Sequence, residues 1–265
     1  MIYTSAIIRC AASCRLYLHS AVTLIRRVAG VLLLAYVNAI AADGVLELGP
    51  FSTLKPGDPL PENWQPQTFK KIPKHTRYEL VKDADTTVIK AHSDAAASGL
   101  TKTLQLDLKD YPILEWRWKV TNVIIGSNPK TKAGDDYPAR IYLTFEYDPS
   151  RVSAWQRSKY AMAKLLYGAY PPHAGINYIW ENKLPVGTIV PNAFTDRLRM
   201  IVVDGGAEHL NQWRSYRRNV YEDYQQAFGE EPPKVSGIAI MTDTDNTGES
   251  ATAYYGDIRL RAADQ

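Results

Sequence analysis

Apolar and polar residues alternate along much of the chain. In the stretch "LEWRWKV", Leu114, Trp116, Trp118 and Val120 fall on one face of an extended chain, and the charged residues fall on the other. Such alternation predicts strands with one face buried in a core. The stretch "ARIYLTFEY" at 139–147 has the same period. Further strands are predicted at 78–82, 86–91, 103–108, 176–181, 197–203, 235–241 and 251–260.

Two segments have the spacing of helices instead. The stretch "SAWQRSKYAMAKLLYG" (153–168) begins with serine, a favourable N-cap, and ends at a glycine before two prolines. The stretch "NVYEDYQQAFGEEPP" (219–233) carries an aromatic stripe with Tyr224 and Phe228, which predicts core packing. Many strands separated by turn residues, with two peripheral helices, predict an antiparallel β-sandwich of the jelly-roll type. We expect the proline-rich segment 51–73 to lie along an edge as extended chain.

The N-terminus has the layout of a secretory signal peptide. Residues 1–27 contain four arginines and no acid, and the apolar run Val28–Val37 follows them. Ala39 and Ala41 fit a small-x-small cleavage rule, so we expect cleavage before Ala42 and a periplasmic or secreted protein. The apolar run is shorter than the roughly 20 residues that span a membrane, so no span is expected in the mature chain. The long basic region leaves an uncleaved anchor or a downstream start codon as alternatives.

Removal of residues 1–41 changes the charge balance. The whole chain has 31 basic and 28 acidic residues, whereas residues 42–265 keep 27 basic residues and all 28 acidic ones. A slightly acidic domain lacks the basic footprint that nucleic-acid binding requires. Cys10 and Cys14 leave with the presequence, which excludes disulfides and cysteine-bound zinc in the mature chain. The remaining 224 residues are enough for a single domain with an ordinary core.

The stretch "MTDTDNTGE" gathers carboxylates between two apolar runs. An EF-hand loop starting at Asp243 would place Tyr254 at the twelfth position, where a bidentate glutamate is needed, so an EF-hand is excluded. A calcium site of another kind remains a candidate. Asp243, Asp245 and Asn246 could supply several oxygen ligands, joined by Asp257 if the fold brings it back. The alternative is a plain hairpin turn, because Asp, Asn and Gly are the usual residues of turns.

A second acidic pair, in "GDDY", precedes the strand at 139–147. Alternation places Arg140 on the face opposite Ala139 and Leu143. Arg140 could pair with Asp136, or the two residues could bind a ligand carboxylate or sugar hydroxyl. A surface ion pair is the alternative for this arginine.

The stretch "GINYIWEN" carries Tyr178, Trp180 and Glu181. Aromatic rings that face solvent on a sandwich can stack on the apolar face of a sugar, while polar neighbours bind its hydroxyls. These three residues are therefore candidates for a ligand site, with core packing as the alternative. Trp116 and Trp118 share their face with aliphatic residues, and this predicts that they belong to the core.

Nucleophilic catalysis has no support in the sequence. There is no G-x-S-x-G stretch, and the mature chain has no cysteine and only scattered histidines. Glycoside hydrolysis remains open, because its paired carboxylates need only lie about 5 to 9 Å apart in space. Asp136, Glu181, Asp243 and Asp245 are candidates for such a pair, and their spacing selects no two of them.

Several stretches together resemble a bacterial exported family, the domain of unknown function 3047. They are "ASGLTKTLQLDL", "LEWRWKV", "GDDYPARIYLTFEYD", "GINYIWEN", "RNVYEDYQQAFGEEPP" and "IAIMTDTDNTGESATAYYGDIRL". The resemblance runs from about Phe51 to Leu260 and implies no mechanism. The last stretch also resembles the closing strands of galactose-binding-like jelly rolls, including those of carbohydrate-binding modules. This second resemblance implies a sandwich and a carbohydrate or other polar ligand.

Three functions follow as hypotheses. The first is an exported, non-catalytic binding module for a glycan or similar envelope polymer, with calcium as a candidate stabilising ion. The second is a carbohydrate-active hydrolase or lyase that uses paired carboxylates. The third is a structural or assembly protein of the envelope with protein partners only. A fold of this class does not decide between them.

Overall fold

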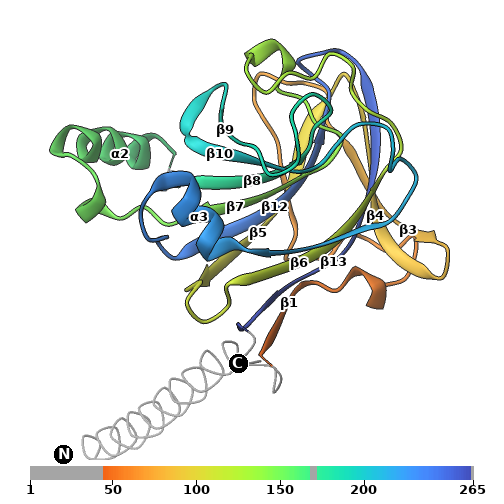
Figure 1. Ribbon diagram of the computed structural model, residues 1–265, viewed down its shortest axis with the longest axis horizontal. Helices are drawn as coiled ribbons and strands as arrows, with labels where there is room; N and C mark the ends of the chain where they lie inside the picture. Colours follow the sequence, from red (N-terminus) through yellow and green to blue (C-terminus); the bar gives the residue numbers. More distant parts are fainter. Residues whose placement is uncertain (1–43, 168–171, 264–265) are drawn as a thin grey trace, which may run out of the picture. The chain divides into compact units, whose positions relative to one another are not determined.

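Two β-sheets pack face to face around the hydrophobic core (Figure 1). The computed structural model describes residues 44–167 and 172–263. The six-stranded sheet has the order β11 (Arg214–Asn219), β6 (Ile113–Val120), β13 (Ser250–Arg261), β4 (Thr86–Asp94) and β3 (Arg77–Asp83), and β1 (Val45–Gly49) also pairs with β13. The seven-stranded sheet has the order β2 (Gln65–Gln67), β5 (Ala97–Leu106), β12 (Val235–Asp243), β7 (Arg140–Phe145), β8 (Gly175–Trp180), β10 (Thr195–Asp204) and β9 (Ile189–Asn192).

The alternation seen in the sequence fills this core. In β7, Ile141, Leu143 and Phe145 are fully buried in the core cluster, and the residues between them face away from it. In β6, the rings of Trp116 and Trp118 lie 5.6 Å apart and are 3% and 0% exposed. The predicted β-sandwich and the predicted core position of both tryptophans are therefore confirmed.

The strand pattern departs from the prediction in two respects. Among the described strands, β8 and β10 run parallel, while the other pairs are antiparallel. Strands β1, β9 and β11 were not predicted, because they are short or, like the "RSYRRN" of β11, mostly polar. The proline-rich segment 51–73 contributes the three residues of β2 at the edge of its sheet. An edge strand tolerates such a proline, since its outer side needs no ladder hydrogen bond.

Within residues 44–167 and 172–263, two helices and three short turns of 3-10 helix accompany the sheets. Helix α3 (Val220–Phe228) begins at Asn219, whose side chain accepts a hydrogen bond from the backbone of Glu222, and ends at Gly229 with a positive φ of 74°. Its Tyr224 ring packs 4.5 Å from Phe145, so the predicted core role of the aromatic stripe is confirmed. The remaining elements are α2 (Ala154–Tyr167) and the 3-10 turns η1 (Phe51–Thr53), η2 (Lys132–Gly134) and η3 (Pro149–Arg151).

The stretch 241–249 connects the two sheets. It leaves β12 in the seven-stranded sheet and enters β13 in the six-stranded one. A plain hairpin between paired strands is therefore wrong for this stretch. The connection places its acidic residues at one end of the sandwich, close to the segment before β7.

The predicted signal peptide, residues 1–41 with cleavage before Ala42, lies outside the described residues. Residues Gly44–Gln265 form one compact unit. Within the part of the chain that the structure describes, no helix is both long and apolar enough to cross a membrane.

Candidate functional site

A groove of about 610 Å³ lies on the outer face of the seven-stranded sheet. Its floor is made by side chains that alternate with the core residues of β5, β12 and β7. Small residues such as Gly99 and Ala239 keep the floor low, and a Cβ atom at Gly99 would lie 3.1 Å from a backbone oxygen of β12. The other floor residues are Ala97, Thr101, Arg140, Tyr142, Thr144 and Met241.

Aromatic side chains form the walls of the groove. Phe69 and Ile72 come from the segment after β2, and Phe194 comes from the turn between β9 and β10. Phe69 is 38% exposed and Phe194 is 55% exposed, although both are large apolar residues. Exposed rings beside a concave surface are a usual feature of ligand sites. Gln67 adds a polar group to the same wall.

Arg140 closes one end of the groove and is itself only 2% exposed. Its Nε donates to Oδ1 of Asp243 at 2.7 Å, and its Nη2 donates to Oδ2 of the same carboxylate. Nη2 also donates to the backbone oxygen of Asp135, and Nη1 donates to the Tyr142 hydroxyl at 2.9 Å. The predicted surface ion pair is wrong, because neighbouring segments cover this part of the sheet. The predicted partner Asp136 is also wrong, since Asp243 takes that place.

The charges around Arg140 fix its protonation state. Burial alone would lower the pKa of its guanidinium, but Asp243, then Tyr142 and Asp135, outweigh burial and hold that pKa well above its usual value. The Asp135 carboxylate lies 3.6 Å from Nη1 of Arg140. Arg140 is thus a permanently charged residue whose donors are already engaged by the protein.

Asp136 shapes the loop after β12 rather than facing a ligand directly. Its Oδ1 accepts hydrogen bonds from the backbone N–H of Asn246 at 3.3 Å and from the Asn246 side chain at 3.0 Å. Its Oδ2 accepts a hydrogen bond from the backbone N–H of Thr247 at 2.6 Å. Because Asp136 is fully buried, these bonds fix the loop against the segment before β7.

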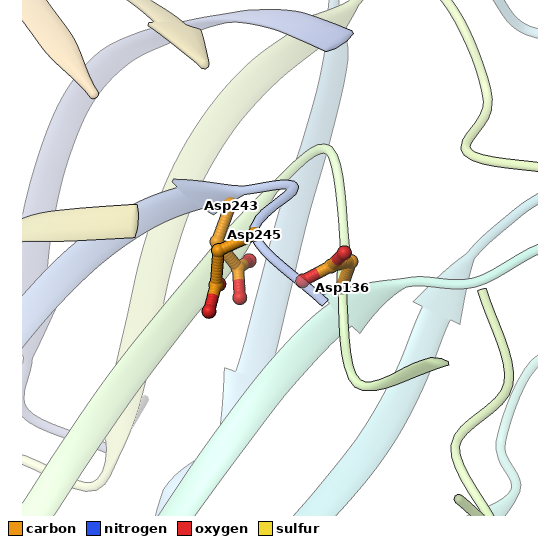
Figure 2. Close-up of side chains that lie close together, drawn as sticks. All are labelled: Asp136, Asp243 and Asp245. Atoms are coloured by element: carbon orange, nitrogen blue, oxygen red, sulfur yellow. The ribbon is translucent and has the colours of Figure 1, made fainter. Parts of the chain in front are cut away.

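Three aspartates meet where this loop reaches the groove. Asp136, Asp243 and Asp245 each offer a carboxylate oxygen, and these oxygens lie within 4.8 Å of one another. Figure 2 shows Asp243 and Asp245 side by side, with Asp136 coming from the neighbouring segment. Burial first, and then the charge of Asp136, raises the pKa of the Asp245 carboxyl above its usual range. With Asp135, four acids face one arginine, so this end of the groove is acidic.

The predicted residues of β8 do not reach the groove. Tyr178 and Trp180 are 0% and 1% exposed, and both belong to the core cluster. The Tyr178 hydroxyl donates to Asp223 at 2.7 Å, and Nε1 of Trp180 donates to the backbone oxygen of Gly206 at 3.2 Å. A solvent-facing aromatic platform at these residues is therefore wrong. Strand β8 is buried on both faces, so its side chains cannot be exposed on either side.

Glu181 and Asp257 also lie away from the groove. Glu181 is 1% exposed, and its Oε2 accepts a hydrogen bond from the backbone N–H of Lys183 at 2.6 Å. Asp257 lies in β13 and accepts hydrogen bonds from the backbone N–H and the hydroxyl of Ser52, at 2.8 and 2.5 Å. Asp257 does not join the aspartate cluster, so its predicted place among the metal ligands is wrong.

Most residues that line the groove were not predicted from the sequence. Phe69 and Phe194 stand in irregular segments without a period, and nothing in the sequence brings those segments together. Tyr142 lies two residues after Arg140 on the same face, so alternation could have identified it. Asp135 was seen only as the first acid of "GDDY", although it lines the groove.

Comparisons with known proteins give one family and several solved structures. The family described as "Protein of unknown function (DUF3047)" matches residues 62–259. No curated protein sequence matches the chain. A family 11 carbohydrate-binding module of cellulase Lic26A-Cel5E from Clostridium thermocellum is 9% identical, with a TM-score of 0.41, over 84% of this chain and 97% of that one.

Two further solved structures are similar at the same level. A family 30 carbohydrate-binding module of the Clostridium thermocellum cellulase Cel9D-Cel44B is 11% identical, with a TM-score of 0.37, over 77% of this chain and 88% of that one. A thermostable variant of the Cel12A cellulase of Rhodothermus marinus is 11% identical, with a TM-score of 0.38, over 82% of this chain and 100% of that one. These distant similarities assign no ligand. The family match covers most of the described domain, and the chain belongs to the DUF3047 family.

Proposed function

We propose that this protein is a non-catalytic, exported domain that binds an uncharged glycan in the groove of the seven-stranded sheet. One observation carries the proposal: an open groove of about 610 Å³ has exposed Phe69 and Phe194 on its walls and polar side chains between them. Sugar rings present an apolar face of C–H groups and a rim of hydroxyls. The aromatic walls can pack against the C–H face, and Gln67, Thr101 and Asn246 can form hydrogen bonds with the hydroxyls.

The charges of the groove favour an uncharged ligand over an acidic one. Asp135, Asp136, Asp243 and Asp245 lie at this end of the groove with one arginine, Arg140, and Nζ of Lys132 lies over the Phe194 ring. Together these residues leave a formal charge of −2. The donors of Arg140 are held by Asp243, Asp135 and Tyr142. A ligand carboxylate would meet excess negative charge and find no arginine able to receive it. Export is supported by the arrangement of charged, apolar and small residues at the N-terminus.

A calcium ion at the acidic end of the groove is part of this proposal. The carboxylate oxygens of Asp136, Asp243 and Asp245 lie within 4.8 Å of one another, and Asn246 adds an amide oxygen to the same loop. Hard cations prefer such oxygen donors. A cation here would offset negative charge that Arg140 alone does not balance and would hold the loop in place.

Calorimetric titration with a panel of soluble oligosaccharides tests the proposed function. We expect binding of at least one neutral member among cello-, manno-, xylo- and N-acetylated chito-oligosaccharides, and weaker binding of oligogalacturonate. Phe194→Ala and Phe69→Ala should each weaken binding by about 1 to 2 kcal/mol, the usual contribution of a stacking ring. Trp155→Ala, which removes a 69% exposed ring outside the groove, is the matched control and should bind normally. The absence of saccharide binding across the panel would contradict the proposal.

Hydrolysis is the second candidate, and one observation favours it. Asp245 combines a raised pKa with a carboxylate neighbour, Asp243, at the edge of the groove. The oxygens of these two carboxylates lie within 4.8 Å of each other, close to the separation of about 5 Å that retaining glycosidases use. Glu181 and Asp136 are no longer candidates for this pair. Glu181 lies away from the groove, and the Asp136 carboxylate is already hydrogen-bonded to the loop after β12. Release of new reducing ends during the titrations, lost in Asp245→Asn, would favour this candidate.

A further inference from the structure

Helix α2 carries large apolar side chains that face solvent. The helix projects outward from one end of the sandwich (Figure 1). Trp155 is 69% exposed and Met162 is 64% exposed, although large apolar side chains are usually buried. Neither residue lines the groove of the seven-stranded sheet. The exposed apolar area of this helix therefore has no role in the proposed function.

The two exposed residues lie on one side of the helix. They are seven positions apart in the sequence, which is close to two turns of about 3.6 residues each. Tyr160 comes two positions before Met162 and therefore lies on the opposite side. Its ring stacks on that of Tyr147 with 4.1 Å between the centroids, and its hydroxyl donates to the backbone oxygen of Pro172 at 3.4 Å. One side of the helix thus contacts the body of the protein, and the side with Trp155 and Met162 faces outward.

The helix is basic as well as apolar. Its 14 residues include two lysines, one arginine and no acid. The arginine, Arg157, is exposed, and its Nε donates to a neutral backbone oxygen. In the turn before the helix, Arg151 pairs with Asp148 at 3.3 Å, so these two residues add no net charge. Glu231, whose backbone oxygen accepts a hydrogen bond from Arg151, is paired with Lys109 at 3.0 Å. The helix and this turn therefore have a formal charge of +3.

We propose that helix α2 binds the surface of a membrane that contains anionic phospholipids. A helix with an apolar side and a basic, polar side lies in the plane of such a surface, with its apolar side between the headgroups and the acyl chains. Tryptophan favours this boundary, because its ring is apolar and its N–H can still donate to a polar group. The positive charge of the helix attracts the anionic headgroups. The helix then lies on the bilayer without crossing it.

Charge disfavours a second copy of this chain as the occupant of the same side. Two copies of the helix would bring two formal charges of +3 together, and like charges across an interface oppose association. An anionic bilayer instead offers many negative groups in one plane, with an apolar layer directly beneath them. It therefore matches both properties of the helix.

Flotation of the protein with lipid vesicles measures this binding. We expect binding to vesicles of phosphatidylcholine mixed with phosphatidylglycerol, and roughly tenfold weaker binding to phosphatidylcholine alone. The double variant Trp155→Ser/Met162→Ser should lose at least tenfold in affinity for the mixed vesicles, and each single variant should lose a part of it. Ile125→Ser, which removes a 76% exposed apolar side chain between β6 and β7, is the matched control and should bind normally. Thermal melts check that every variant folds, and the single variants carry the test if the double variant does not.

Arg157→Gln tests the charge and leaves the apolar side intact. This variant should bind the mixed vesicles about fivefold more weakly, because it removes one charge near the anionic surface. Added salt should weaken the binding of the unaltered protein for the same reason, since salt screens exposed charges. Arg77→Gln, which removes an exposed arginine of β3, is the control and should bind normally.

Four results would overturn the proposal. The first is the absence of binding to the mixed vesicles, and the second is equal binding to neutral and mixed vesicles. The third is an equal loss in Ile125→Ser, because binding would then depend on exposed apolar residues in general. The fourth is a dimer in sedimentation velocity that dissociates in Trp155→Ser, which would assign this side of the helix to a second copy of the chain.

Discussion

The outer faces of the two sheets use arginine and carboxylate groups in opposite ways. On the seven-stranded sheet, Arg140 is 2% exposed and is held by Asp243 and Asp135 at the end of a deep groove. On the six-stranded sheet, Glu115 lies beneath exposed arginines of β11 and β13 in a hollow of about 390 Å³. The first arrangement buries an arginine among acids, and the second places one acid beneath solvated arginines.

The covering segments explain the difference. Residues 67–72 and the turn around Phe194 form walls beside the seven-stranded sheet. At the end of that groove, the Arg140 guanidinium lies 4.3 Å from the Tyr137 ring and contacts Asp135, so it loses contact with water. The hollow on the six-stranded sheet is different, because all the described residues that line it belong to strands of that sheet. Its arginines therefore remain solvated. A buried ion pair has lost its hydration and must keep its partner, whereas exposed pairs exchange easily with ions from solution. Burial thus makes Arg140 a structural residue, whereas Arg259 belongs to a solvated surface pair with Glu115.

The largest expected effect comes from breaking the buried pair. Arg140→Met leaves Asp243 buried without its cation, and loss of one partner of a buried pair costs about 3 to 5 kcal/mol of unfolding free energy. Arg259→Gln, the exposed counterpart, should cost less than about 1 kcal/mol, as surface pairs do. Urea unfolding measures both. The double variant Arg140→Met/Asp243→Asn should regain part of the loss, since it removes the unpaired charge. Equal losses in Arg140→Met and Arg259→Gln would contradict the contrast between the two faces.

Calcium should act on the acidic end of the groove alone. At a hundredfold excess over Kd, a bound ion adds about 2.7 kcal/mol, which is about 5 to 11 °C in Tm for a domain of this size. Asp245→Ala should abolish this rise by removing one oxygen donor from the cluster, while leaving the Arg140 pair intact. Thermal melts with calcium and with a chelator measure the effect.

Asp257→Asn is the control for the calcium melts. Asp257 lies in the six-stranded sheet, against Ser52, so this variant should keep the full response to calcium. A rise in Tm that survives Asp245→Ala, or one that is lost in Asp257→Asn, would place the ion elsewhere. If calcium gave no rise in Tm, the calcium part of the proposed function would be wrong. The proposed binding of a glycan in the groove would not be affected by that result.

The sequence-based predictions were best where alternation within one strand decides on which face a side chain lies. Alternation identified the strand of Arg140 and placed this side chain on the face away from the core, where the structure has it. The same period placed Trp116 and Trp118 in the core. Both results depend only on neighbours within one strand, and a half-buried strand imposes that pattern directly.

Prediction failed where residues from distant segments decide the environment. Alternation could not show that Tyr137 and Asp243 pack against Arg140, so a surface ion pair was predicted where a buried one exists. Trp180 lies in a strand buried on both faces, and there a period of two no longer separates inside from outside. Asp257 lies eight residues beyond the end of the 243–249 loop, yet the chain has crossed to the other sheet before it. Only the three-dimensional arrangement separates these acids.

Hydrogen exchange with and without a neutral oligosaccharide reports which face of the sandwich the ligand covers. The groove account predicts added protection in peptides that span 67–72, 97–101 and 239–246, and none in peptides that span 115–117, 215–217 and 257–261. The ligand should be the neutral hexasaccharide that gives the largest heat in the calorimetric panel. Protection confined to the second set of peptides would contradict the account, since the saccharide would then lie on the six-stranded sheet.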